Sequence, residues 1–199
     1  MQEVIENYHA DAVRSFRNCK KLAERAIEQV SDEEFFALIG PEVNSIAIIV
    51  KHVAGNLRSR WTDFLTTDGE KDFRDRDTEF ELIGDTRESL MQQWESGWHA
   101  LFENIEPLTV EDFSRIITIR GDSHTVIEAI NRQMMHYAMH IGQIVLLAKH
   151  FKSSDWKTLS VPRNKSAEFN RFLADKQAEG SQSNNRLDDV LEFVEKEGR

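Results

Sequence analysis

The stretch that decides the fold runs from residue 125 to residue 150 and reads TVIEAINRQMMHYAMHIGQIVLLAKH. Its hydrophobic residues recur every three or four positions and form one stripe, made of Val126, Ile130, Tyr137, Ile141, Ile144 and Ala148. This spacing is typical of an amphipathic helix. Thr125 and Glu128 have the spacing of a capping box, and Gly121 breaks the chain just before them. We therefore predict a long helix over about residues 123–150.

Three further segments show the same periodicity, over about residues 4–30, 44–65 and 86–105. Gly40-Pro41 separates the first two, and Asn44 or Ser45 can cap the second. A charged crossover over residues 66–85 separates the second from the third. Three tryptophans fall at core positions of these helices: Trp61, Trp94 and Trp98. The four segments predict an all-α fold.

The rest of the chain is less regular. Residues 112–120 alternate loosely and fit either a short strand or an extended connection. After Phe151 we expect an irregular segment packed over the helices, then a flexible linker over residues 180–186 and a short helix over 187–195. We place one domain over residues 1–174 and treat residues 175–199 as linker and tail.

Composition excludes several classes of function. The 199 residues carry a net charge of -10, which argues against nucleic-acid binding and against docking on an anionic membrane. Cys19 is the only cysteine, so neither an intrachain disulfide nor a thiolate cluster can form. The acidic N-terminus does not resemble a signal peptide, and the longest uncharged stretch, 133–148, is too short to span a membrane. We expect a soluble cytoplasmic protein.

His136 and His140 are the most informative residues of the predicted fourth helix. An i, i+4 pair lies about 40° apart around the helix axis and about 6 Å along it, so both rings point to one side. Between Arg132 and Lys149 there is no charged residue. In this apolar setting each ring nitrogen needs a partner, and one bound metal ion can satisfy a nitrogen on each ring.

The segment 44–65 supplies a third candidate ligand, His52. By the helical wheel it lies about 120° from the centre of the apolar stripe of that segment. Small or polar residues share its flank: Ser45, Asn56 and Ser59. We expect room for a cavity there, with His52 facing the other two histidines. Three protein ligands leave coordination positions open, which is typical of a catalytic metal site.

Two interpretations without catalysis also remain open. One is a non-catalytic bundle that binds metal or a small ligand, and the other is a helical interaction protein whose histidines are structural. The other histidines fit surface or capping positions better than a fourth ligand or a base: His9, His99, His124 and His150. Gln143 can orient a substrate or simply face the mouth of the bundle. Three arginines fit surface charges better than an anion site: Arg58, Arg60 and Arg120. Cys19 fits a small buried hydrophobe.

Three stretches carry a resemblance to a known family: residues 44–47 (NSIA) leading into His52, residues 136–144 (HYAMHIGQI) and residues 156–163 (WKTLSVPR). They resemble the DinB/YfiT-like superfamily of metalloenzymes, and within it a DinB-like branch of undefined function. The resemblance covers roughly residues 8–171. The histidine motif is its most specific part.

The resemblance implies a four-helix bundle with a long connection between the second and third helices. It also implies one divalent ion, nickel or zinc, on His52, His136 and His140. Relatives with known activity include transferases and an isomerase that use low-molecular-weight thiols, so we expect a thiol-dependent S-transferase or a metal-assisted hydrolase acting on a small molecule. Many such proteins are homodimers, and an apolar face fits that expectation: Met135, Met139 and Leu146.

Overall fold

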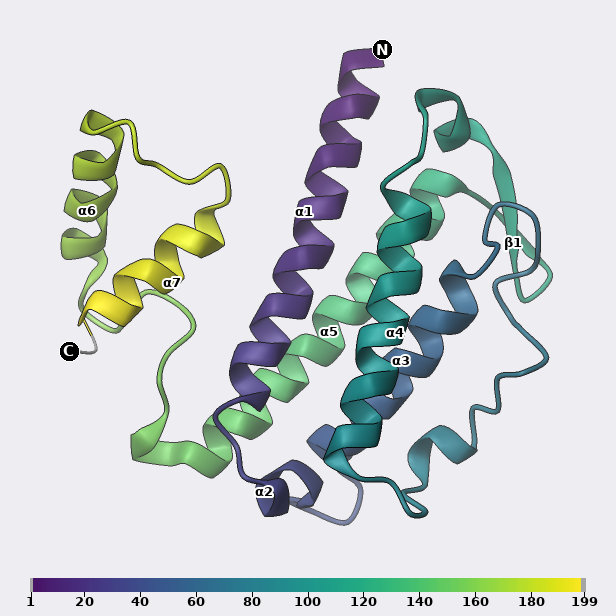
Figure 1. Ribbon diagram of the computed structural model, residues 1–199, viewed down its shortest axis with the longest axis horizontal. Helices are drawn as coiled ribbons and strands as arrows, with labels where there is room; N and C mark the ends of the chain where they lie inside the picture. The colour runs from purple at the N-terminus through teal and green to yellow at the C-terminus, as the bar shows by residue number, and fades with distance from the viewer. Residues whose placement is uncertain (1, 198–199) are drawn as a thin grey trace.

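The computed structural model describes residues 2–197, which form an all-α fold with one small β-hairpin. Four long helices lie side by side (Figure 1). They are α1 (Gln2–Ile27), α3 (Ile46–Trp61), α4 (Arg87–Ile105) and α5 (Val126–Lys152). Each lies within a few residues of a predicted segment, so the prediction of an all-α fold is confirmed.

Side-chain caps determine where three of these helices begin. Thr125 accepts a hydrogen bond from the backbone of Glu128, whose carboxylate accepts one from the Thr125 backbone at 2.7 Å, as the capping-box spacing predicts. Thr86 and Ser89 form the same reciprocal pair before α4. Ser45 accepts from the backbone of Ile48 at 3.2 Å. These local bonds explain why the helix starts were predictable.

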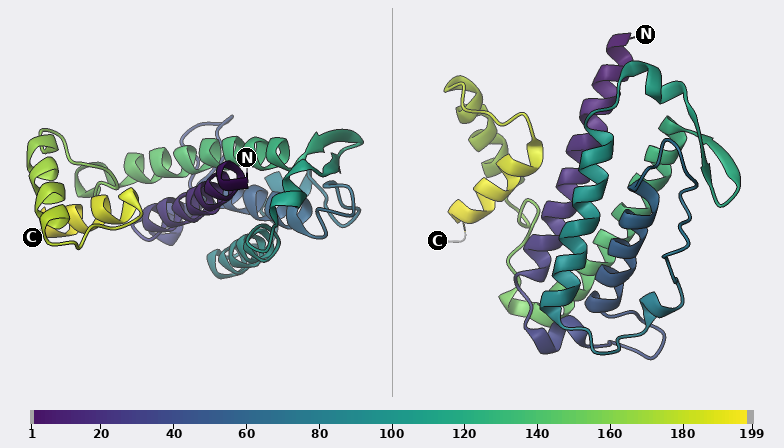
Figure 2. Two further views of the ribbon diagram at one scale, coloured as in Figure 1. Left: turned by 90° about the horizontal axis from the view of Figure 1, so that it is seen from above. Right: turned by 45° about the vertical axis from the view of Figure 1, so that its right-hand side comes forward.

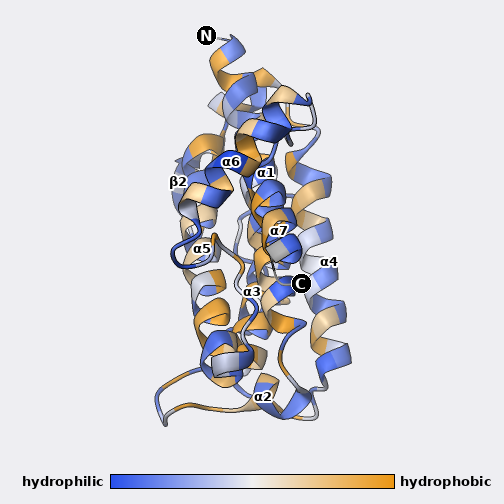
Figure 3. Ribbon diagram, turned by 90° about the vertical axis from the view of Figure 1, so that its left-hand side faces the viewer, coloured by the Kyte–Doolittle hydropathy of each residue, from blue (hydrophilic) through white to orange (hydrophobic). Residues whose placement is uncertain are grey.

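The helices run in two opposed pairs. Helices α1 and α5 run in one direction and α3 and α4 in the other (Figures 1 and 2). Helix α3 packs mainly on α4 and also meets α5, while α1 packs mainly on α5. Their hydrophobic faces enclose one core in which the three predicted tryptophans are buried: Trp61, Trp94 and Trp98. In Figure 3 hydrophobic and hydrophilic residues alternate along the length of these helices.

Because α3 and α4 are parallel neighbours, residues 62–86 must return along the length of the bundle (Figure 1). This crossover segment contains one short helix, η1 (Thr78–Phe80). After α4 and the short helix η2 (Val110–Ser114), strands β1 (Ile116–Ile119) and β2 (Asp122–Thr125) pair antiparallel. The two turn residues between them, Arg120 and Gly121, both adopt positive φ. The stretch 112–120 thus contains a strand, the first of the two structures predicted for it.

Two α-helices, α2 (Asp32–Phe36) and α6 (Ser166–Ala178), lie where no helix was predicted. Ser31 caps α2 just after the end of α1. Helix α6 spans residue 174, where we placed the domain boundary. Helix η3 (Ser153–Asp155) precedes it, and α7 (Arg186–Glu197) matches the predicted terminal helix.

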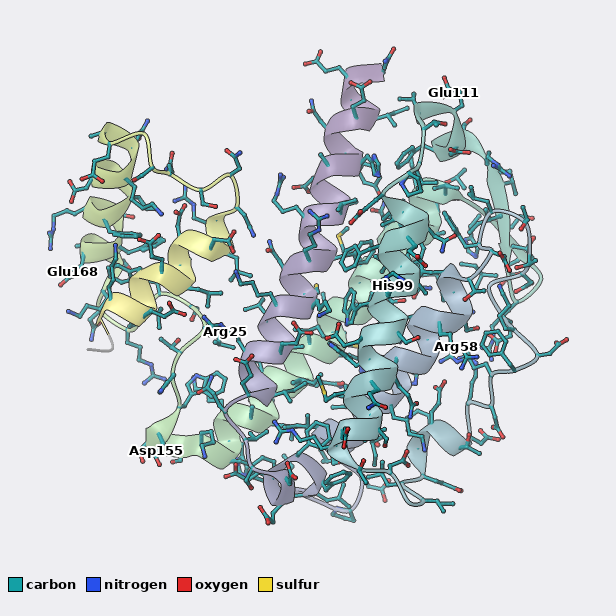
Figure 4. All side chains as sticks on the ribbon, viewed as in Figure 1. Arg25, Arg58, His99, Glu111, Asp155 and Glu168 are labelled. Atoms are coloured by element: carbon teal, nitrogen blue, oxygen red, sulfur yellow. The ribbon has the colours of Figure 1, made fainter. Side chains whose placement is uncertain are left out.

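Helices α6 and α7 form a hairpin that lies beside α1 (Figures 1 and 2). Three rings within this hairpin contact one another: Phe169 and Phe172 are stacked, and Phe193 meets Phe169 edge-on and Phe172 at a tilt. Lys21 of α1 contacts Asp188 of α7 at 2.6 Å, and Arg25, labelled in Figure 4, pairs with Glu195. Salt bridges therefore join the hairpin to α1.

Within residues 2–197, no helix combines the length and the apolar character needed to cross a membrane.

Candidate metal centre

Helices α3 and α5 contact each other and run antiparallel. The predicted metal ligands of the two helices lie close together at this contact. The Nε2 atom of His136 lies 3.3 Å from Nε2 of His52 and 3.1 Å from Nε2 of His140. One nitrogen from each of the three rings lies within 4.8 Å of the other two. All three side chains are half-buried. The structure thus brings together the three histidines that the sequence singled out.

Hydrogen bonds on the far side of two rings define which nitrogen carries the proton. Nδ1 of His52 lies 2.9 Å from a carboxylate oxygen of Glu79, and Nδ1 of His140 lies 2.8 Å from the amide oxygen of Gln143. Both oxygens are acceptors, so each Nδ1 carries the proton and each Nε2 presents a lone pair. The two lone pairs point toward His136.

This donor set fits a transition-metal ion. A proton on Nε2 of His136 can serve only one of the two neighbouring lone pairs, whereas a cation can accept all three nitrogens. Imidazole nitrogens bind zinc at about 2.0–2.1 Å, so two of them at a tetrahedral angle lie about 3.3 Å apart. The separations of 3.1 and 3.3 Å match that spacing. Neutral imidazoles also suit nickel and copper.

Glu79 is held in place from three sides. Arg74 donates two hydrogen bonds to its carboxylate, at 2.8 and 2.9 Å, and both side chains are buried. His52 bonds the carboxylate on a second side. On the third side lies Gly55 of α3, where an added Cβ would be 3.0 Å from Cδ of Glu79 and closer still to Oε1. The absence of a side chain at Gly55 therefore lets the carboxylate lie against α3 and reach His52. Such a carboxylate orients a ligating imidazole and raises its basicity.

Burial of the histidines and hydrogen bonds to Glu79 keep these groups in the ionisation states that a metal site requires. Desolvation lowers the pKa of His136 to about 3, and repulsion from the neighbouring imidazoles adds to this effect. Desolvation also lowers the pKa of His140. For Glu79, burial alone would raise the pKa, but the bonds from His52 and Arg74 lower it overall. His136 and His140 are therefore neutral near pH 7, and Glu79 is charged.

The flank of α3 around His52 is packed, contrary to our expectation of a cavity. Ser45, Asn56 and Ser59 are all buried. Asn56 accepts a hydrogen bond from Tyr137 at 3.0 Å, and Ser59 donates one to the backbone oxygen of Gly69 at 2.8 Å. The polar side chains on this flank thus join α3 to α5 and to the crossover segment. The partners of Asn56 and Ser59 lie outside α3 and could not be inferred from its pattern, whereas Ser45 caps α3 as predicted.

The other histidines lie apart from this cluster. His9 bonds the backbone oxygen of Ile105 at 2.7 Å, and His99 (labelled in Figure 4) is exposed and pairs with Glu103 on α4. His124 lies on β2, and His150 is exposed near the end of α5. His99 and His150 thus lie at the surface as we expected, whereas His9 and His124 are half-buried.

The three arginines have different environments. Arg58, labelled in Figure 4, is exposed and stacks over the ring of Phe73 at 4.5 Å, and Arg120 is exposed beside Glu70. Arg60, expected at the surface, is only 6% exposed and bonds the backbone oxygen of Gly69. That prediction was wrong, because the crossover segment folds back over this face of α3. Cys19 is half-buried, and desolvation raises its pKa.

The sequence interpretation missed the residues behind His52: Glu79, Arg74 and Gly55. The first two lie in the charged crossover, where no periodic pattern marks one carboxylate among many. One signal was available in Gly55, because a glycine inside a helix costs about 1 kcal/mol relative to alanine. Its position three residues after His52 indicates a close approach by another group.

A protein-family model described as "Protein of unknown function (DUF1572)" matches residues 3–165. The chain belongs to this family. The DUF1572 match includes all three histidines, Glu79 and Gln143, and it ends just before α6. No curated protein matches the chain significantly, and no solved structure does.

Proposed function

We propose that this chain is a metal-dependent enzyme of the DinB/YfiT type, with one divalent ion, zinc or nickel, on His52, His136 and His140. In this proposal α1, α3, α4 and α5 form the four-helix bundle of that superfamily, with residues 62–86 as its long connection. The observation that carries it is the convergence of three Nε2 atoms with separations of 3.1 and 3.3 Å along two sides.

The surroundings of the rings support a bound ion over a structural role. Glu79 and Gln143 hold protons on the Nδ1 atoms, which leaves the Nε2 lone pairs facing inward. Two of the rings are neutral near pH 7 because burial lowers their pKa. In a purely structural cluster a proton on Nε2 of His136 could serve only one of its two neighbours, so a buried lone pair would lack a donor, which is unfavourable.

Three neutral protein ligands leave coordination positions for a water molecule or a substrate. An ion held there would supply a Lewis acid that acidifies a bound thiol or water near neutral pH. We propose a thiol-dependent S-transfer, or a hydrolysis, of a small molecule. The contribution of the chain is to orient His52 through Glu79 and His140 through Gln143. Arg74 in turn keeps Glu79 charged and in place.

Metal titration tests the proposal. Chelator-treated protein should bind one equivalent of zinc or nickel, as measured by elemental analysis after gel filtration. His136→Ala and His140→Ala should each lose stoichiometric binding, whereas His99→Ala, an exposed histidine on α4, should retain it. Equal metal content in all four proteins would refute the site.

A second assay separates an enzyme from a non-catalytic metal protein. The metal-loaded protein should consume a low-molecular-weight thiol in the presence of an electrophile, or hydrolyse an activated ester or amide, and His140→Ala should abolish this activity. Stoichiometric metal without either activity would favour sensing or storage instead.

We also propose a homodimer formed through the outer face of α5. Three apolar side chains are exposed there, with relative exposures of 75%, 55% and 66%: Met135, Met139 and Leu146. Exposed apolar patches of this kind mark interaction surfaces. Light scattering on the purified protein measures its mass directly, and a monomer at micromolar concentration would exclude the dimer.

A further inference from the structure

The three rings of the metal centre differ in what holds their outer nitrogen. Nδ1 of His52 bonds Glu79, and Nδ1 of His140 bonds Gln143. Nδ1 of His136 is buried, and within residues 2–197 it has no hydrogen-bond partner. When Nε2 of His136 faces the other rings as a ligand, Nδ1 carries the proton. The ring therefore presents a buried donor that needs an acceptor.

A matching acceptor lies one turn earlier on the same helix. Gln133 is 3% exposed, and its Oε1 atom is buried without a hydrogen-bond partner in the described part of the chain. Side chains three residues apart on a helix are neighbours, and helical side chains lean toward the N-terminal turn. The ring of His136 therefore leans toward Gln133. Nδ1 of His136 lacks an acceptor, and Oε1 of Gln133 lacks a donor.

Helix α5 already contains one direct bond between a histidine and a glutamine three residues apart. Nδ1 of His140 lies 2.8 Å from Oε1 of Gln143, with the glutamine on the C-terminal side of the histidine instead of the N-terminal side. Other buried donors without partners among the described residues do not exclude such a bond; they include Nε of Arg60, Nη1 of Arg74 and Nε1 of Trp98. An amide oxygen has two lone pairs and can accept from one such donor and from His136 together.

We propose that Gln133 is the positioning residue of His136: its amide oxygen accepts the Nδ1 proton when the metal ion is bound. The inference rests on the proposed metal site and deepens it. A rotation of the Gln133 side chain forms the bond. The bond fixes the ring tautomer and directs Nε2 at the ion, as Glu79 does for His52 and Gln143 for His140. Each of the three ligands then has its own acceptor.

Two substitutions of similar size test this role. Gln133→Met removes the acceptor and keeps an apolar chain, whereas Gln133→Glu keeps an acceptor at the same position. Gln92→Met makes the first change at an exposed site on α4 and serves as the control. For each protein we would measure the zinc dissociation constant by chelator competition. Exchange of the His136 Nδ1 proton in the zinc-loaded protein, followed by NMR of the ring, reports the bond itself.

We expect Gln133→Met to weaken zinc binding about 10–100-fold and to accelerate exchange of that proton, since loss of such a partner has this effect at metal sites. Gln133→Glu and Gln92→Met should retain wild-type affinity. Unchanged affinity in Gln133→Met, or an equal loss in both Gln133 variants, would overturn the inference and leave the metal site standing. Failure of the wild-type protein to bind zinc would instead overturn the proposed function, and this inference with it.

Discussion

Gly55 and Gly142 provide a matched pair of substitutions beside the candidate metal centre. Gly55 lies three residues after His52 on α3, and Gly142 lies two residues after His140 on α5. A Cβ added at Gly142 meets no described atom within 4 Å, whereas one at Gly55 would lie 3.0 Å from Cδ of Glu79 and closer to its Oε1. Alanine should therefore fit at one position and displace the carboxylate at the other.

The two effects have opposite signs. Replacing a helix-interior glycine by alanine stabilises a helix by about 1 kcal/mol, and Gly142→Ala should gain this amount with no change in metal affinity. In Gly55→Ala the carboxylate of Glu79 must move, and Arg74 restrains it from the other side. Loss of its bond to His52 should weaken metal binding about 10–100-fold, which corresponds to about 1.4–2.8 kcal/mol.

Zinc affinity measured by chelator competition, together with urea unfolding of the metal-free proteins, tests both expectations. Gly142→Ala should unfold at higher urea than wild type and bind zinc equally well. Gly55→Ala should bind zinc more weakly even where its metal-free fold is intact by circular dichroism. If Gly55→Ala binds zinc as tightly as Gly142→Ala, then Glu79 does not orient His52 and this reasoning is wrong.

Three further outcomes are expected. The pKa of His136 is about 3 in the folded protein and about 6.5 in the unfolded chain, so the unfolded chain binds more protons between these pH values. The contribution of His136 to the free energy of unfolding is therefore complete above pH 6.5 and falls toward pH 3. Urea titrations of metal-free protein should show a loss of about 2 kcal/mol from this group between pH 7.5 and 5, and His136→Leu should lose correspondingly less. Chelation should lower the melting temperature of the loaded protein, since ligand at 100 times its dissociation constant adds about 2.7 kcal/mol; an unchanged melting temperature would argue against a bound ion. Glu79→Gln leaves Arg74 buried without its charge partner and should destabilise the fold by about 3–5 kcal/mol, and adding Arg74→Met should restore stability in urea titrations but not zinc affinity.

The sequence was sufficient for features that depend on neighbours along the chain. The Thr125 and Glu128 spacing predicted the start of α5, and the His136 and His140 spacing placed both rings on one side of that helix. Both arguments use only helix geometry and local hydrogen bonds. The pairing of His52 with them depends on how α3 packs against α5, and the helical wheel indicated only its flank.

Features that depend on distant partners were not accessible in the same way. The burial of Arg60 follows from its bond to the backbone oxygen of Gly69 in the crossover segment, and nothing in the periodicity of α3 indicates it. Helix α6 escaped prediction because a single side chain, Phe169, is buried along its length. Helix α6 is stabilised by contacts of its aromatic rings with Phe193 of α7. In each case tertiary packing decides the outcome.

The topology itself explains why the crossover segment contributes to the metal centre. Helix α3 has 16 residues and is about 24 Å long, and an extended chain of about 7–8 residues could return over that distance to start a parallel α4. Residues 62–86 are far more than the return requires. The surplus folds over α3, where Arg74 and Glu79 reach the outer side of His52, and Lys51 anchors its end through Asp85 at 2.9 Å. The parallel arrangement of α3 and α4 thus requires a return connection, and the extra length of that connection supplies the carboxylate that bonds His52.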